Sequence, residues 1–205
     1  MIKNGLFSCF LGLAIFSVQA QELSNFEKAS ETLNAVYTHY AVPGTQLLRE
    51  HYPFDDQYKA DYLGGGENSH KANPYAYLWP YSGSLSAQVA RYEAEPSVAI
   101  KKEIDGNVLV GLAAYYDTRA PHGYASYVNT APLSDRFYDD NVWLGIDFTD
   151  LYLFTKEPQY LHKAKEIWSF VASGMDEKLG GGIYWCEQKK ESKNTCSNAP
   201  SVVYL

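Results

Sequence analysis

The stretch that decides the fold reads Phe137-Tyr138-Asp139-Asp140-Asn141-Val142-Trp143 and opens a long amphipathic segment. Two neighbouring carboxylates, Asp139 and Asp140, stand there among aromatic side chains at the expected start of a helix. Acidic residues are favoured at the N-cap and in the first turn, because they meet free N–H groups and the positive end of the helix dipole. Taken alone, the pair is explained by helix capping.

Trp143 gives the pair a second interpretation. It follows Asp139 by four residues and Asp140 by three, so on a helix it lies one turn above both acids. An aromatic face beside two carboxylates resembles the floor of a sugar-binding site. The two interpretations are compatible, since the start of a helix can also aim both carboxylates into a site.

The first residues of the chain have the layout of a secretory signal peptide. Lys3 precedes an apolar run from Leu6 to Val18, and Ala20 provides a small residue before the first polar stretch. The run is too short for a membrane-spanning helix. We therefore expect a signal peptide over residues 1–20, a domain over residues 21–205, no membrane span, and a periplasmic or extracellular protein.

Composition narrows the classes of partner. The part after the signal, about 185 residues, suffices for one domain with a hydrophobic core. A net charge of −7 without a basic cluster argues against nucleic acid and against an anionic membrane surface. The 18 Tyr and 4 Trp combine apolar faces with polar edges, which suits sugars, although an aromatic-rich helical core would use the same residues.

Cys186 and Cys196 form an even pair once the signal peptide is removed, and a disulfide between them remains open. No spacing of Cys, His and acidic residues resembles a zinc site. We expect neither a metal nor a cofactor, and we expect a monomer.

Apolar periodicity predicts paired helices along most of the chain. The expected helices run over residues 25–41, 82–92, 96–116, 140–154 and 158–173, and a further helix begins at residue 199. Long loops over residues 52–81 and 119–135 alternate with tight turns, which predicts a toroid of helical hairpins with the loops gathered on one face around a cleft. An α-solenoid would look similar, but the sequence has no self-similar repeat.

The end of the chain and the first loop carry two further expectations. The last helix has no stop signal before Leu205, so we expect the sequence to be a fragment. Trp79 and Tyr81, at the end of the first long loop, are candidate sugar platforms, and the alternative is that they pin this loop to the core.

Three ordered motifs resemble glycoside hydrolase family 76. They are Tyr138-Asp139-Asp140-Asn141-Val142-Trp143-Leu144-Gly145, Gly180-Gly181-Gly182-Ile183-Tyr184-Trp185 and Lys193-Asn194-Thr195-Cys196-Ser197-Asn198-Ala199-Pro200. Leu78-Trp79-Pro80-Tyr81-Ser82 also stands where that family places an aromatic segment of its cleft.

The resemblance implies an all-α (α/α)6 barrel, truncated here to about half, and endo-α-1,6-mannanase activity on α-mannan by a retaining mechanism. It implies that Asp139 is the nucleophile and Asp140 the general acid/base. Retaining hydrolysis needs two carboxyl groups roughly 5–5.5 Å apart, which titrate as a coupled pair at that distance. The residues themselves do not indicate which aspartate holds the proton.

Around the pair, Trp143 and Trp185 are candidate platforms, and Asn194 and Asn198 are candidate partners of sugar hydroxyls. The loop of the two asparagines is equally well explained as a capped turn. Two other functions remain open: a transglycosidase that uses the same intermediate, and a non-catalytic helical protein that binds glycans through its aromatic residues.

Overall fold

The computed structural model describes residues 22–55, 57, 74–128 and 134–205. The predicted signal peptide over residues 1–20 and part of the long loop over residues 52–81 lie outside these ranges. The helices are α1 (Asn25–Tyr40), α2 (Leu78–Ala94), α3 (Val98–Glu103), α4 (Leu109–Leu112), α5 (Tyr138–Thr155), α6 (Pro158–Ala172) and α7 (Thr195–Tyr204). Two short strands, β1 (Tyr116–Asp117) and β2 (Gly123–Tyr124), pair antiparallel between α4 and α5.

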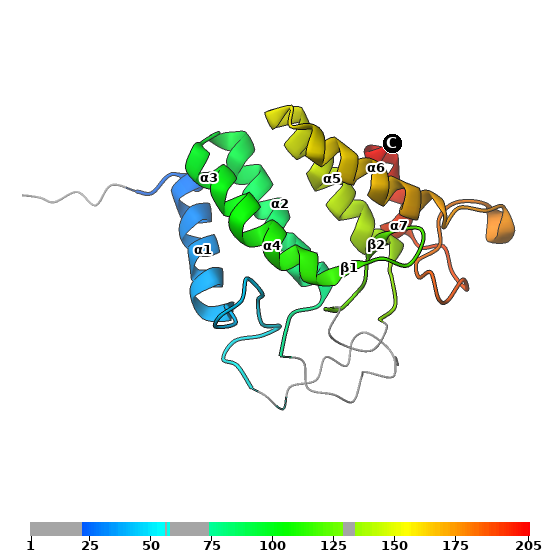
Figure 1. Cartoon of the computed structure of the whole chain (residues 1–205), viewed down its shortest axis with the longest axis horizontal. Helices are drawn as coiled ribbons and strands as arrows, with labels where there is room; N and C mark the ends of the chain where they lie inside the picture. Colours follow the sequence, from blue (N-terminus) through cyan, green and yellow to red (C-terminus); the bar gives the residue numbers. More distant parts are fainter. Residues whose placement is uncertain (1–21, 56, 58–73, 129–133) are drawn as a thin grey trace, which may run out of the picture.

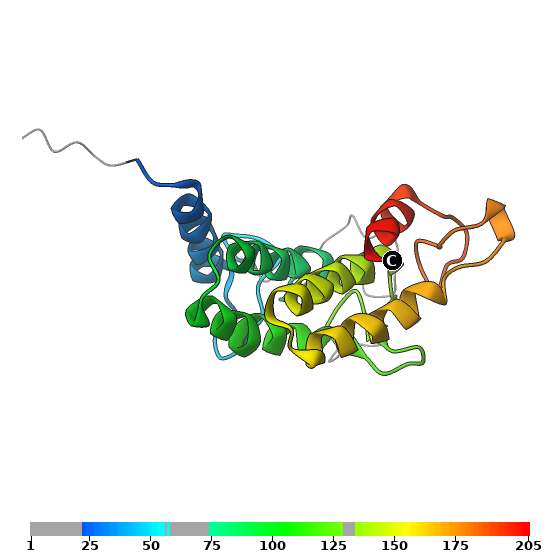
Figure 2. The ribbon, with the colours of Figure 1, turned by 90° about the horizontal axis from the view of Figure 1, so that it is seen from above.

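The helices form hairpins that stand side by side. α2 and the α3–α4 segment make one hairpin, and α5 and α6 make the next (Figure 1). α5 packs against its partner α6 and also against α2 and α7, which lie on either side of it. From above, α1 and α7 lie near opposite ends of this arrangement (Figure 2). The arrangement agrees with the predicted toroid of helical hairpins.

Local signals in the sequence place several helix ends correctly. Ser24 caps α1 in a reciprocal box, in which Ser24 Oγ accepts from the Glu27 amide at 3.2 Å and the Glu27 carboxylate accepts from the Ser24 amide at 2.7 Å. Pro158 occupies the first turn of α6, where its missing N–H costs no hydrogen bond.

The helix predicted over residues 96–116 is interrupted in the structure. A π-helical turn, Ile104–Val108, separates α3 from α4, and a 3-10 turn, Ala113–Tyr115, ends the segment. The Tyr81 hydroxyl reaches this region and donates to the carbonyl oxygens of Val108 and Gln46, each at 3.0 Å. Gly111 makes room for it, because a Cβ there would lie 2.0 Å from the Tyr81 hydroxyl oxygen.

Asn141 ties the strand pair to α5. Its side chain is fully buried, and its Oδ1 accepts from the Tyr124 amide at 2.8 Å. Its Nδ2 donates to the carbonyl oxygens of Tyr124 and Phe137, each at 2.9 Å. The amide therefore satisfies backbone groups of β2 and of the start of α5 at once.

The segments that precede α2 and α5 meet at one end of the hairpins, in the lower part of Figure 1. The Leu78 amide donates to the Ser126 carbonyl at 2.8 Å, and the Ser126 amide donates to the Asp135 carbonyl at 2.9 Å. The Tyr138 amide donates to the Trp185 carbonyl at 2.9 Å. The predicted gathering of loops on one face therefore holds for these described segments, and the start of α5 lies within it.

Across the described ranges, none of the helices combines the length and the apolar character that a membrane span requires.

Candidate active site

Asp139 and Asp140 lie in the first turn of α5, which begins two residues earlier than the sequence predicts. The N-cap residue is Phe137, and no side chain caps the helix. Neither aspartate therefore acts as the N-cap, and that part of the interpretation is wrong, whereas the expected place of both acids in the first turn is correct. The positive end of the helix dipole still faces both carboxylates.

Asp140 is the more deeply buried member of the pair, with 7% of its surface exposed. Burial raises the pKa of its carboxyl well above the ordinary value, and the neighbouring charge of Asp139 raises it further. Both effects disfavour the charged form in the same direction. Asp140 therefore keeps its proton at pH values at which an exposed aspartate has already lost it.

Asp139 is partly buried and is held by an indole group. Its Oδ2 accepts a hydrogen bond from Trp185 Nε1 at 3.2 Å. Its Oδ1 is buried and has no hydrogen-bond partner of normal geometry among the described residues. Burial raises the pKa of this carboxyl, while the nearby Cys196 thiol, the Trp185 indole and backbone amides of the first turn oppose the rise.

The two environments act differently on two identical side chains. At Asp139 nearby donors oppose the rise in pKa that burial causes, whereas at Asp140 burial and the neighbouring charge both raise the pKa. Adjacent groups of this kind titrate as a coupled pair that keeps one proton over a wide pH range. The arrangement can therefore present one carboxylate and one carboxylic acid together.

Trp185 is part of the site, with its polar edge turned to Asp139. The ring packs against Phe137 with centroids 4.8 Å apart, and the indole N–H is used by the Asp139 carboxylate. The sequence predicts a sugar platform here; the structure adds a contact with the candidate nucleophile that the sequence did not indicate.

The two other tryptophan candidates present accessible rings. Trp79 is 63% exposed and Trp143 is 43% exposed. Trp143 lies on α5 as predicted, but Trp79 belongs to the first turn of α2 and not to a loop, because that helix begins at Leu78. Their contact with a sugar stays a prediction.

Tyr81 is not available as a sugar platform, and that prediction is wrong. The side chain is 1% exposed, and its hydroxyl is used by two backbone carbonyl oxygens of other segments. The alternative interpretation, an aromatic residue that belongs to the core, describes Tyr81 correctly.

Asn198 serves the backbone. Its Oδ1 accepts from the Ile183 amide at 2.8 Å, and its Nδ2 donates to the carbonyl oxygens of Ile183 and Asn194, each at 2.9 Å. The side-chain amide thus holds the segment of Ile183 against the start of α7, and both of its N–H donors are used, so the prediction that Asn198 binds a sugar hydroxyl is wrong. The capped turn is not found either, because Asn198 lies inside α7 and no side chain caps that helix. Asn194 is the N-cap residue of α7 without a side-chain cap bond, and its role toward a sugar stays a prediction.

Cys186 and Cys196 are free thiols, so the disulfide that the sequence left open does not form. Cys186 is buried and Cys196 is exposed. Burial and the charge of Asp139 raise the pKa of the Cys196 thiol, which places this thiol beside the aspartate pair. In the sequence Cys196 is singled out only as a member of the third motif. Nothing near it in the sequence predicts that it lies beside Asp139.

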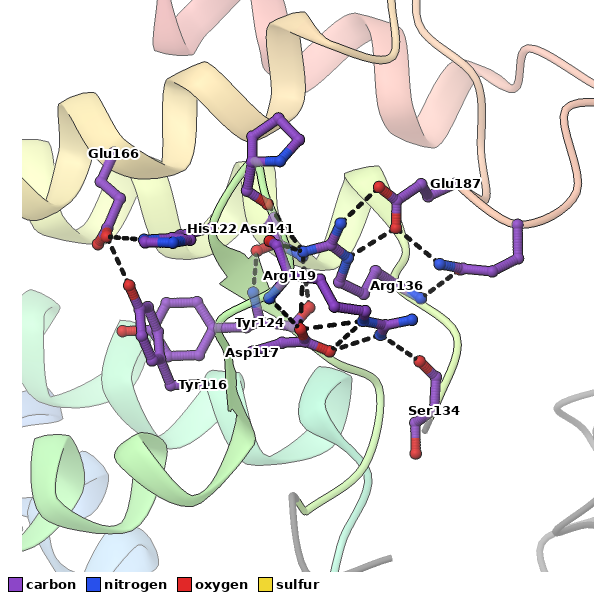
Figure 3. Close-up of polar contacts among 12 residues, drawn as sticks. Tyr116, Asp117, Arg119, His122, Tyr124, Ser134, Arg136, Asn141, Glu166 and Glu187 are labelled. Atoms are coloured by element: carbon purple, nitrogen blue, oxygen red, sulfur yellow. Dashed lines mark hydrogen bonds and ion pairs between the residues drawn. The ribbon is translucent and has the colours of Figure 1, made fainter. Parts of the chain in front are cut away.

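A network of two arginines and two acidic residues lies next to the start of α5, and the sequence did not predict it. Figure 3 shows Arg136 between Glu187 and the pair formed by Asp117 and Arg119. These residues are scattered between positions 117 and 187, so no spacing in the sequence connects them. Nothing local in the sequence indicated that Arg136 is buried.

Among the described residues, no group of three or more His, Cys, Asp or Glu side chains is arranged to hold a metal ion.

Comparison with known families and structures gives consistent matches. A family model described as glycosyl hydrolase family 76 matches residues 51–204. A solved family 76 glycoside hydrolase (mannosidase) from Bacteroides thetaiotaomicron VPI-5482 is 30% identical, with a TM-score of 0.69 over 87% of this chain and 46% of that one. A family 76 enzyme from a bovine strain of the same species is 29% identical, with a TM-score of 0.69 over 87% of this chain and 36% of that one.

A third structure is an inactive variant of an α-1,6-mannanase from a Salegentibacter species, with two successive aspartates replaced by asparagine and α-1,6-mannotriose bound. It is 20% identical, with a TM-score of 0.60 over 87% of this chain and 43% of that one. No curated protein sequence matches the chain. The chain thus spans less than half the length of these solved relatives, and the fold prediction of (α/α)6 helical hairpins, about half of the toroid, is confirmed.

Proposed function

Since the chain belongs to glycosyl hydrolase family 76, as its motifs predict, we propose that Asp139 and Asp140 form the active site of a glycoside hydrolase that cleaves α-1,6-linked mannan. The single observation that carries the proposal is the pair itself: two adjacent carboxyl groups in the first turn of α5, both partly or fully buried and both with a raised pKa.

The substrate class is supported by the relatives. One solved relative at 30% identity is described as a mannosidase, and an α-1,6-mannanase with the same fold has α-1,6-mannotriose bound. That mannanase is inactive when two successive aspartates are changed, and this chain has two successive aspartates at the start of α5. The predicted signal peptide fits an exported enzyme that meets the polysaccharide outside the cytoplasm.

We assign Asp139 as the nucleophile. In a retaining reaction its carboxylate attacks the anomeric carbon, and the bond from that carbon to the glycosidic oxygen breaks. The attacking group must be charged, and the Trp185 indole donates to Asp139 Oδ2, which stabilises the carboxylate.

We assign Asp140 as the general acid/base. Its proton passes to the glycosidic oxygen as the leaving sugar departs, and Asp140 becomes a carboxylate while Asp139 carries the mannosyl group. Asp140 then takes a proton from a water molecule, whose oxygen attacks the anomeric carbon and releases Asp139. Burial and the charge of Asp139 keep the proton on Asp140 in the free enzyme.

The test is digestion of linear α-1,6-mannan by the protein in its natural full length, with products separated by size. Asp139→Asn and Asp140→Asn should each lower the rate of release by about 100-fold or more, since acid/base and nucleophilic groups contribute at least that much. Asp147→Asn is the matched control, because it removes a buried carboxyl from the same helix without touching the pair.

Retention of activity in both active-site variants would overturn the proposal, as would the failure of the wild-type protein to shorten the polysaccharide. Formation of products longer than the substrate would instead identify the transglycosidase, which uses the same first step. Binding without cleavage, unchanged in both variants, would identify a glycan-binding protein.

A further inference from the structure

Two segments that are distant in sequence cross at the start of α5. Phe137 pairs with Cys186 in an isolated antiparallel bridge. On one side of the bridge the Tyr138 amide donates to the Trp185 carbonyl at 2.9 Å, and on the other the Glu187 amide donates to the Arg136 carbonyl at 3.0 Å. Arg136 and Glu187 are therefore opposite each other, and Trp185 lies beside the first turn of α5.

The side chains of Arg136 and Glu187 join the two segments at this crossing through an ion pair. Arg136 is 1% exposed, and its Nε and Nη2 donate to the two carboxylate oxygens of Glu187 at 2.6 and 2.5 Å. Such a paired fork fixes the relative orientation of both side chains, in addition to their distance.

The third nitrogen of the guanidinium group is also hydrogen-bonded. Arg136 Nη1 donates to the carbonyl oxygens of Arg119 and Pro121, each at 2.8 Å, and lies 3.9 Å from Asp117 Oδ1 (Figure 3). Asp117 is itself paired with Arg119. The cluster holds two positive and two negative charges, so it is neutral as a whole.

An ion pair with a buried guanidinium and a half-buried carboxylate is a costly way to obtain stability alone, since desolvation of the charges offsets much of their attraction. In some proteins such pairs instead favour one register and one orientation of the segments that they join. The register selected here brings the Trp185 indole to Asp139, because Trp185 lies two residues before Glu187 and Asp139 three residues after Arg136.

We propose that the Arg136–Glu187 ion pair is a positioning element for the candidate nucleophile, which holds the segment of Trp185 against the start of α5 so that the indole orients Asp139. The inference rests on the proposed function, in which Asp139 is the nucleophile. Arg136 and Glu187 act through Trp185 and do not touch the sugar.

Three variants of the full-length protein test whether the Arg136–Glu187 ion pair acts on Asp139 through Trp185. Glu187→Gln keeps the size of the side chain and removes its charge, and Arg136→Lys keeps the charge and removes the fork. Trp185→Phe removes the donor to Asp139 and keeps an aromatic ring. Glu191→Gln is the matched control, since Glu191 is an exposed acid of the same loop.

The first readout is the indole N–H signal of Trp185 in a nitrogen–proton NMR spectrum, identified by its loss in Trp185→Phe. Glu187→Gln and Arg136→Lys should move this signal and make its proton exchange faster, while Glu191→Gln leaves it in place. An unchanged signal in both Arg136→Lys and Glu187→Gln would overturn the inference. This readout does not require catalysis.

The second readout is the cleavage of α-1,6-mannotetraose. Glu187→Gln should lower kcat by between about tenfold and about 100-fold, the usual result of a small displacement of a reacting group, with KM changed by less than kcat. The acid limb of the pH profile should move to higher pH, because a carboxylate that loses a donor has a higher pKa.

The double variant Glu187→Gln/Trp185→Phe separates positioning from general loss of structure. If Glu187 acts through Trp185, the double variant is no slower than Trp185→Phe alone. Losses that multiply would overturn the inference. If the wild-type protein cleaves no mannan, the proposed function fails, and the indole signal alone then decides whether the ion pair positions Trp185.

Discussion

Asp147→Asn should make the protein more stable, by an amount that grows as the pH rises from about 4 to about 7. Asp147 is buried on α5, where its Oδ2 accepts from Ser86 Oγ of α2 at 2.8 Å. Burial raises the pKa of this carboxyl to about 7, helped by the charge of Asp150 and opposed by Ser86. The folded protein therefore holds a proton that the unfolded chain has already released.

The sign of the pH dependence follows from this difference. Between the unfolded pKa of 3.8 and the folded pKa of about 7, the folded state binds more protons, so stability falls as the pH rises. Each unit of pKa corresponds to about 1.4 kcal/mol, so the loss approaches about 4 kcal/mol above pH 7 as an upper limit. An asparagine stays neutral and can still accept from Ser86.

Urea denaturation of wild type and Asp147→Asn at several pH values between about 4 and 8 measures the effect. The free energy of unfolding of the variant should exceed that of wild type by an amount that grows steadily with pH. The two should be nearly equal at the acid end and differ by about 2–4 kcal/mol at the alkaline end. Glu31→Gln, which changes an exposed acid of α1, should show no such trend. A difference between Asp147→Asn and wild type that is zero, or constant over this range, would refute the assignment of a buried, protonated Asp147.

Gly145→Ala should destabilise the contact of α5 with α7 by about 1–3 kcal/mol, because the new Cβ would lie 2.1 Å from the Tyr204 ring; Gly83→Ala, which meets nothing within 4 Å, is the control and should be neutral or stabilising in thermal denaturation. Cys196 should react with iodoacetamide in the folded protein well before Cys186, because Cys196 is exposed and Cys186 is buried. Peptide mass spectrometry reports both sites, and equal rates would contradict the described burial.

Features that depend on neighbouring residues could be predicted from the sequence. The capping box of Ser24 and Glu27, the position of Pro158 and the apolar stripes place α1 and α6 to within a residue or two, because these signals act over one or two turns. The adjacency of Asp139 and Asp140 at a helix start was visible for the same reason, although the start itself lies earlier than predicted.

Features that depend on distant contacts could not be predicted. Tyr81 stands in an aromatic segment that suits a sugar platform, but it is buried because its hydroxyl satisfies carbonyl oxygens from two other segments. Asn198 has an amide suited to a sugar hydroxyl, yet Ile183 uses both its donor and its acceptor. The side chain alone does not reveal which partner it will find.

The contact of Trp185 with Asp139 has the same origin. Each residue is conspicuous by itself, but only the crossing of the two segments at Phe137 and Cys186 brings the indole to the carboxylate. At this crossing the buried Arg136 pairs with the half-buried Glu187, and the sequence carries no local signal for that ion pair.

Site-resolved carbon NMR of the two carboxyl groups shows whether Asp139 and Asp140 hold a carboxylate and a carboxylic acid side by side. With signals assigned from Asp139→Asn and Asp140→Asn, we expect Asp140 to stay protonated at pH values well above the ordinary pKa of an aspartate. We also expect Asp139→Asn to lower the pKa of Asp140, because the neighbouring charge is removed. Independent titration of both carboxyl groups near the pKa of an exposed aspartate would show that the two groups do not share a proton in this way.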